Sequence, residues 1–115
     1  MEFDTFTVAL LETGSDTPSK NATEIHALQD AHMDYLARLH EAGDLQAAGP
    51  LVIPPGSSIR GLCLCRLPTE AVRALLERDP LVRAGRLTVR IFSWMVPKGA
   101  ISFSRTTFPH SEAEL

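Results

Sequence analysis

The longest periodic pattern of apolar and polar residues runs from Asn21 to Gly43 and predicts one amphipathic helix. At about 100° per residue, one side of this helix collects Ile25, Leu28, Tyr35, Leu36 and Leu39. Asn21 and Glu24 have the spacing of a capping pair, and Gly43 stands where a helix commonly ends in a left-handed residue. His32 falls inside the apolar side, so we expect its imidazole to face whatever the helix packs against.

Shorter apolar patterns on either side of this helix predict strands. They cover Phe3–Glu12, Leu45–Ile53, Ile59–Leu67 and Leu87–Val96. A second helix is expected between the last two strands, from Thr69 as its N-cap to near Arg78. The order strand, helix, strand, strand, helix, strand predicts an α+β, ferredoxin-like fold in which both helices cover one face of an antiparallel sheet.

The chain has 115 residues, enough for one domain with a core of its own. We expect this domain over residues 1–98 and a C-terminal extension over residues 99–115. The extension contains a candidate short strand at Ile101–Ser104, followed by a polar, acidic tail that we expect to be partly mobile.

The predicted sheet is apolar on both faces. In the first strand Phe6 and Val8 point to one face, and Ala9 and Leu11 point to the other. Helices on one face leave the second face uncovered, and an apolar sheet face needs a cover. A second copy of the chain, related by a two-fold axis, is the simplest cover, so we expect a homodimer.

Charge and composition narrow the range of partners. The net charge is −3 and Lys and Arg form no run, so neither nucleic acid nor an anionic membrane is an expected partner. No apolar stretch approaches the roughly 20 residues of a membrane-spanning helix, and the N-terminus lacks a secretory signal pattern. Cys63 and Cys65 are poorly placed for a disulfide or a zinc site and fit two buried thiols in the cytoplasm. We expect neither a metal nor a cofactor.

His32 has two interpretations. A histidine on the apolar side of a helix is often a core residue with a backbone or carboxylate partner. The other interpretation is a general base or acid in a pocket under the helix, because imidazole titrates near neutral pH.

A set of short motifs resembles one known family. The set comprises His32–Leu39, Ala42–Leu45, Ala48–Leu51, Thr69–Val72, Asp79–Gly85 and the strand that carries Trp94. In this order and spacing, over residues 3 to 96, they resemble the YCII-related family of small dimeric α+β barrel proteins. The chain departs from the family pattern after residue 96, where it is longer, and at Ser57-Ser58, where glycines are often seen.

This resemblance implies a ferredoxin-like fold that dimerises into an α+β barrel. It also implies an active site on a histidine of the first helix and an aspartate before a proline, which match His32 and Asp79. Dehydrochlorination of an aromatic ring compound is an activity associated with the family.

The remaining site candidates each have a structural alternative. Asp79 before Pro80 is a good helix N-cap, and the same carboxylate can also orient His32. Gly49 and Pro50 indicate a strand bulge or an edge, or a pocket wall. Tyr35 and Trp94 are candidates for substrate binding, and both also fit a core or dimer-interface position.

Three functions are consistent with these residues, and the dehydrochlorination of an aromatic compound named in the first is what the family resemblance implies. The first is a small cofactor-independent enzyme that transfers a proton through His32 and Asp79, suited to elimination, dehydrochlorination or isomerisation of a small substrate such as an aromatic compound. The second is a non-catalytic module that binds a small molecule, or regulates, through the same pocket. The third is a structural interaction domain in which His32 and Asp79 are only a core polar pair.

Overall fold

The computed structural model describes residues 1–14 and 19–115 of the chain. Its strands are β1 (Phe3–Thr13), β2 (Ala47–Pro50), β3 (Ile59–Cys65) and β4 (Leu87–Pro97). Its helices are α1 (Ala22–Glu41), α2 (Thr69–Leu76), α3 (Pro80–Arg83) and the short 3-10 helix η1 (Glu112–Glu114). Within these described ranges, no helix has the length and apolarity needed to cross a lipid bilayer.

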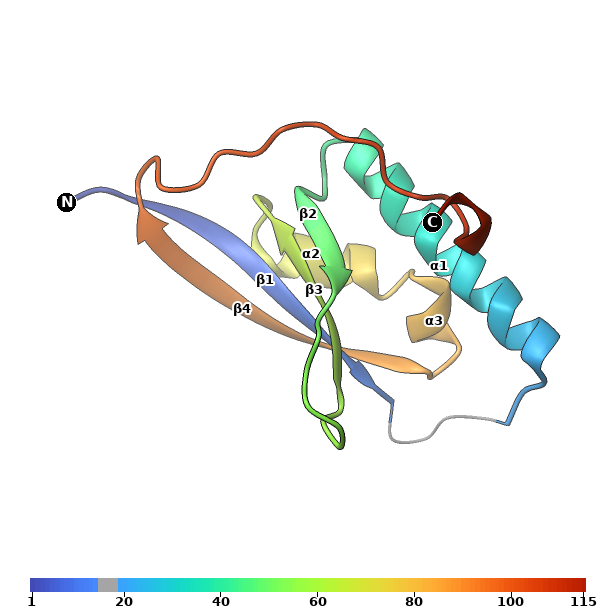
Figure 1. The fold of residues 1–115 in the computed structure, drawn as a ribbon. Coiled ribbons are helices and arrows are strands. Elements are labelled where there is room, and N and C mark those ends of the chain that lie inside the picture. Colours follow the sequence, from blue (N-terminus) through green and yellow to red (C-terminus); the bar gives the residue numbers. More distant parts are fainter. Residues whose placement is uncertain (15–18) are drawn as a thin grey trace.

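The four strands form one antiparallel sheet in the order β2-β3-β1-β4 (Figure 1). The long strands β1 and β4 pair along their whole length, with Phe6 opposite Trp94. Ala9 lies opposite Cys63 on β3. This order, with the helices inserted after β1 and β3, confirms the predicted α+β, ferredoxin-like fold.

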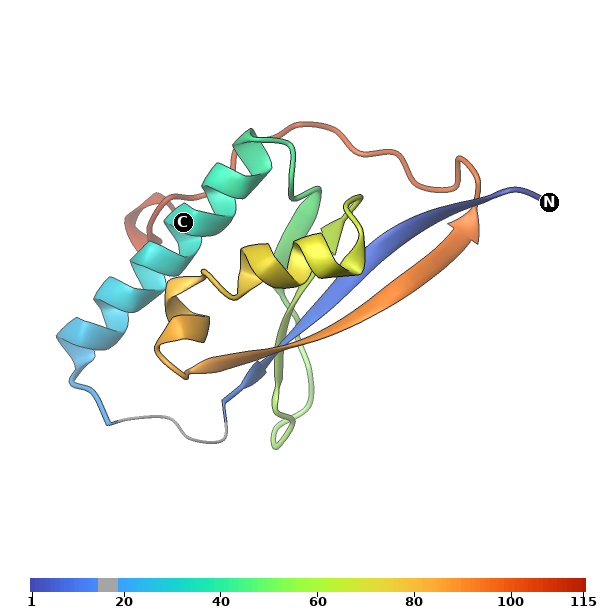
Figure 2. The same ribbon diagram turned by 180° about the vertical axis from the view of Figure 1, so that it is seen from behind.

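The helices cover one face of the sheet, as the views from opposite sides show (Figures 1 and 2). The core lies between them and consists of Ala9, Leu11, Leu39, Leu45, Cys63, Cys65, Val72, Leu76, Leu81 and Leu87. Val72 and Leu76 bring the apolar side of α2 onto the sheet, and both are almost fully buried. The period of the apolar residues therefore determines which side of each helix packs inward.

Helix α1 begins and ends as its sequence predicts. The Asn21 side chain accepts a hydrogen bond from the Glu24 amide at 2.9 Å, and its own amide group donates to the Glu24 carboxylate at 2.8 Å. Gly43 has a φ of 85°, the left-handed conformation that glycine adopts without strain. His32 lies in the middle of this helix, about two turns before His40, the last buried residue of α1.

Three predicted boundaries are wrong. The second strand is not Leu45–Ile53 but only Ala47–Pro50. Leu45 instead turns into the core with 1% exposure, and after the Leu51 amide has donated to the Arg60 carbonyl at 2.9 Å the chain leaves the sheet. Thr69 is the first residue of α2 rather than its N-cap, a position that Pro68 takes without a side-chain bond. Ile101–Ser104 is not a strand but an unpaired segment within the described chain.

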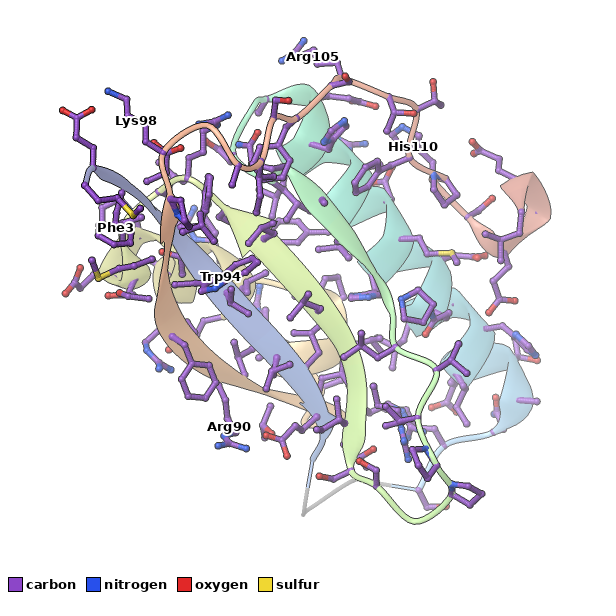
Figure 3. The ribbon with its side chains drawn as sticks, turned by 60° about the vertical axis from the view of Figure 1, so that its left-hand side comes forward. Phe3, Arg90, Trp94, Lys98, Arg105 and His110 are labelled. Atoms are coloured by element: carbon purple, nitrogen blue, oxygen red, sulfur yellow. The ribbon has the colours of Figure 1, made fainter. Side chains whose placement is uncertain are left out.

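This unpaired segment covers part of the second sheet face. Ile101 and Phe103 pack on a cluster formed by Phe6, Leu64 and Val96. The rings of Phe6 and Phe103 meet edge to face, with centroids 5.5 Å apart at 88°. The rest of this face stays open, and Trp94 points out of it with 43% of its surface exposed (Figure 3).

Candidate functional site

The buried polar pair of the fold is His32 and Asp79. The Nδ1 atom of His32 lies 2.5 Å from Oδ2 of Asp79, and the side chains are 11% and 0% exposed. The second carboxylate oxygen, Oδ1, accepts a hydrogen bond from the Leu81 amide at 2.9 Å. Both oxygens of Asp79 therefore have donors, as a buried carboxylate requires.

Two elements hold this pair together. Helix α1 places His32 on its inward side, and the turn between α2 and α3 places Asp79 beneath it. Asp79 is the N-cap of α3 and Pro80 takes the first helical position, where its missing amide has no consequence. The capping role and the contact with His32 thus coexist, because each uses a different carboxylate oxygen.

The hydrogen bonds define the tautomer of His32. A carboxylate that already accepts from the Leu81 amide is an acceptor toward the imidazole as well, so Nδ1 of His32 carries the proton. In the neutral ring this leaves Nε2 with a free electron pair. A histidine held in this tautomer by a carboxylate is the arrangement of a general base.

His32 lines a cavity of about 560 Å³. The floor is the sheet, where Leu11, Gly61 and Cys63 contribute, and one wall is α1. The edge strand β2 and the C-terminal segment complete the boundary. Most lining side chains are apolar and His32 is one of few polar groups, which is the usual composition of a small-molecule site.

The structure brings some of the predicted site residues together and separates others. Gly49 and Pro50 line the cavity with His32, and a Cβ atom at Gly49 would meet open space. Asp79 lies behind His32 rather than in the wall. Tyr35 faces the core, where its hydroxyl donates to the Leu75 carbonyl at 2.7 Å and burial raises the pKa of the phenol. Trp94 lies on the opposite face of the sheet.

Several lining residues were missed by the sequence reasoning. Gln29 lies three residues before His32, so helical spacing alone could have assigned it to the same side, as it did for Leu36. Arg60 also lines the cavity, and its guanidinium donates to the carbonyls of Ser57 and Ile59 at 3.0 and 3.1 Å. Phe108 and Pro109 carry no local signal for a cavity, since they reach it only through the path of the C-terminal segment.

The cysteines are inert in this environment. Cys63 and Cys65 are free and buried, and burial raises the pKa of the Cys63 thiol to about 12 and that of Cys65 to about 11. A thiol with so high a pKa is a poor nucleophile at neutral pH. Over residues 1–14 and 19–115, no three His, Cys, Asp or Glu side chains converge as a metal site.

A protein-family model for the YCII-related domain matches residues 8–95 of the chain. That range covers the four strands except the first five residues of β1 and the last two of β4, and it includes both His32 and Asp79. No curated protein sequence matches the chain.

Among solved structures, the fold is similar to 5-chloro-2-hydroxyhydroquinone dehydrochlorinase (TftG) from Burkholderia phenoliruptrix AC1100, in complex with 2,5-dihydroxybenzoquinone. The TM-score is 0.54 and the sequence identity 16%, over 77% of this chain and 92% of that protein. At this identity the likeness concerns the fold.

Proposed function

We propose a function for this chain from its family and its cavity: it belongs to the YCII-related domain family, and His32 lines an apolar cavity. The proposed function is that of a cofactor-independent enzyme in which His32 transfers a proton of a small aromatic substrate. The observation that carries the proposal is the buried contact of 2.5 Å between His32 Nδ1 and Asp79 Oδ2. It leaves Nε2 as the basic atom of a ring that lines an apolar cavity.

The chemistry that fits this arrangement is elimination. His32 Nε2 takes a proton from the substrate, the electron pair of the broken bond forms a new double bond, and chloride or another anion departs with the electrons of its own bond. Asp79 is a positioning residue that keeps the proton on Nδ1 and stabilises the imidazolium that forms. Isomerisation uses the same first step, followed by return of the proton to a different atom.

The related fold of the dehydrochlorinase suggests which compounds to test. The activity test takes 5-chloro-2-hydroxyhydroquinone as substrate and measures chloride release. The binding test takes 2,5-dihydroxybenzoquinone as a probe and measures its affinity by calorimetry. Replacing a general base typically lowers turnover by about 10²–10⁴-fold. We therefore expect His32→Gln to lower kcat in this range while the affinity for the probe changes only severalfold. Chloride release that is unchanged in His32→Gln would overturn the proposal.

Asp79→Asn is the second variant, because it keeps the size of the side chain and replaces one carboxylate oxygen by a donor. Glu77→Gln is its matched control, since it makes the same exchange on an exposed side chain two residues earlier. We expect Asp79→Asn to lose turnover and Glu77→Gln to retain it. If the wild type binds the probe but releases no chloride from any chlorinated hydroxyaromatic, the cavity belongs to a non-catalytic binding module.

We further propose that the chain forms a homodimer through the open face of the sheet. Phe92 and Trp94 are each 43% exposed on this face, and Ile101 and Phe103 cover only the part around Phe6. An apolar sheet face of this kind needs a cover. Sedimentation equilibrium at micromolar concentration is expected to give a dimer for the wild type and a monomer for Trp94→Glu. A monomeric wild type would contradict this proposal.

We also propose a cytoplasmic location, on the evidence of the two cysteines. Cys63 and Cys65 are both free, and free buried thiols fit a reducing compartment such as the cytoplasm. Fractionation of cells that express the tagged chain would test this assignment.

A further inference from the structure

The C-terminal segment, residues 105–112, lies along α1 outside the region that the family model matches (Figure 1). It is attached to the helix at five places. These are Arg105 Nη2 to the Glu41 carbonyl at 2.8 Å, the Thr106 amide to His40 Nε2 at 3.1 Å, the His110 ring to two carboxylates, the Glu112 amide to Asp30 Oδ1 at 2.8 Å, and the Glu112 carboxylate to His26 Nδ1 at 3.0 Å. The segment thus contacts the helix from its second turn to its end.

Between these contacts the segment faces the cavity. Phe108 and Pro109 form part of its boundary, on the side of the sheet where His32 lies. The Phe108 ring also stacks on His40, with centroids 4.1 Å apart and planes at 12°. His40 Nδ1 lies 2.7 Å from the Leu45 carbonyl, so its proton is on Nδ1, and Nε2 is the acceptor for the Thr106 amide.

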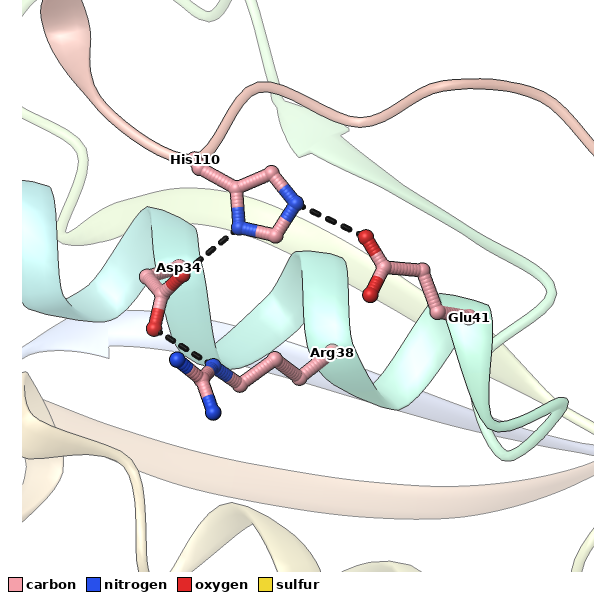
Figure 4. Close-up of polar contacts among 4 residues, drawn as sticks. All are labelled: Asp34, Arg38, Glu41 and His110. Carbon is pink, nitrogen blue, oxygen red and sulfur yellow. Dashed lines mark hydrogen bonds and ion pairs between the residues drawn. The ribbon is translucent and has the colours of Figure 1, made fainter.

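His110 is the contact whose chemistry depends on its charge. Its Nδ1 lies 2.6 Å from Oδ1 of Asp34, and its Nε2 lies 2.7 Å from Oε1 of Glu41 (Figure 4). Both partners are acceptors, and a neutral imidazole has only one N–H group. Only the imidazolium can donate to both carboxylates at once, so deprotonation of His110 removes one of its two attachments.

The surrounding charges favour the imidazolium. The hydrogen bonds to Asp34 and then Glu41 raise the pKa of His110, and the bond from His110 is the largest cause that lowers the pKa of Asp34. Arg38 also donates to Asp34, at 2.7 Å, and so supports the carboxylate form. On the segment itself the nearest charged groups along the chain are Arg105, bound to a carbonyl, and Glu112, bound to His26.

We propose that residues 105–112 form a lid over the His32 cavity, that Phe108 and Pro109 are its inner surface, and that protonated His110 is the latch that holds it closed. The lid would then limit the size of the ligand and the rate at which it enters and leaves. This inference rests on the proposed function of the cavity as a binding site. The latch requires a charged His110, because only the imidazolium donates to both Asp34 and Glu41.

The sign of the pH dependence follows from the contacts. His110 binds its proton more tightly when latched, so the latch is complete below the ordinary histidine pKa of about 6.5. It is lost as the pH rises through the raised pKa of His110. An alkaline shift is therefore expected to open the lid while the rest of the fold is unchanged.

The test measures access to the cavity in the protein without ligand. A neutral, soluble gadolinium chelate enhances the relaxation of methyl groups that solvent reaches, and Met33, which carries a methyl group, lines the cavity. Leu76, 1% exposed in the core, and Val52, fully exposed, serve as internal references for closed and open sites. We expect the relaxation of the Met33 methyl to rise severalfold from about pH 6 to about pH 9, while both references stay constant.

Two variants separate the latch from other titrations. His110→Gln is expected to give a high and pH-independent relaxation of Met33. His26→Gln is the matched control, since His26 contacts the same segment through the single carboxylate of Glu112, and it should keep the pH dependence of the wild type. An unchanged Met33 methyl across this pH range, or the same pH dependence in His110→Gln, would overturn the lid. Failure of 2,5-dihydroxybenzoquinone to bind at any pH would instead count against the proposed function and leave the relaxation result standing.

Discussion

Asp79 is the residue at which fold and chemistry can be separated most sharply. Its carboxylate is fully buried and holds two contacts, one to the Leu81 amide at the start of α3 and one to His32 Nδ1. Asp79→Ala removes both and leaves two buried donors without acceptors. Asp79→Asn keeps one oxygen for the Leu81 amide and presents its NH2 group to the imidazole.

The expected losses follow from these contacts. Loss of an N-cap side chain lowers stability by about 1 kcal/mol, and a hydrogen bond that involves a charged group contributes about 1.5–3 kcal/mol. We therefore expect Asp79→Ala to lower the free energy of unfolding by about 2.5–4 kcal/mol. Asp79→Asn keeps the cap and the volume, so its loss should be about 1 kcal/mol.

Asp79→Asn has a second consequence at His32. The amide nitrogen of asparagine donates, so the imidazole accepts at Nδ1 and carries its proton on Nε2 instead. The atom that lines the cavity then has no free electron pair. Two-bond nitrogen–proton NMR spectra distinguish the tautomers, and we expect Nδ1–H in the wild type and Nε2–H in the variant.

Urea unfolding followed by circular dichroism gives the stabilities by linear extrapolation. A double-mutant cycle with His32→Ala isolates the contact between the two side chains. A loss below about 1 kcal/mol for Asp79→Ala would refute the view that this carboxylate supports α3 and His32 together. An unchanged tautomer in Asp79→Asn would refute the inferred proton position even if the stability loss were as large as expected.

Three further predictions concern the fold around the cavity. Gly61→Ala places a Cβ atom 3.0 Å from the Gly49 carbonyl oxygen, so β2 must shift. We expect the free energy of unfolding in urea to fall by about 1–2 kcal/mol. We also expect weaker binding of 2,5-dihydroxybenzoquinone. Leu76→Ala empties a fully buried core position without touching the cavity, and should lower stability by about 2–5 kcal/mol while the same probe binds normally. His110 should contribute stability that is lost as the pH rises through its raised pKa. Asp34 should contribute stability that is lost as the pH falls through its lowered pKa. Both contributions should appear in the pH dependence of the melting temperature. The variant His110→Gln should lose both contributions. If the wild type and the variant show the same pH dependence of the melting temperature, the contributions do not arise from this contact.

The sequence determined the features that depend on local spacing. The apolar side of α1 and the capping residues Asn21 and Gly43 specified the longest helix, because helix periodicity and end chemistry are properties of neighbouring residues. The order of strands and helices was sufficient for the ferredoxin-like fold, since few topologies satisfy that order. His32 stood out for the same reason, as a titratable residue on an otherwise apolar side.

Only the tertiary structure decided which residues share the cavity. Gly49 and Pro50 meet His32 there, whereas Tyr35 turns to the Leu75 carbonyl and Trp94 lies beyond the sheet. Each of these outcomes depends on contacts between elements far apart in the chain, which no local spacing encodes. The same is true of the C-terminal segment. Its polar composition resembles that of a free tail, but His110 contacts two carboxylates on α1, those of Asp34 and Glu41. These residues lie seven apart in sequence and on one side of the helix. Only the folded helix brings both carboxylates to a single imidazole.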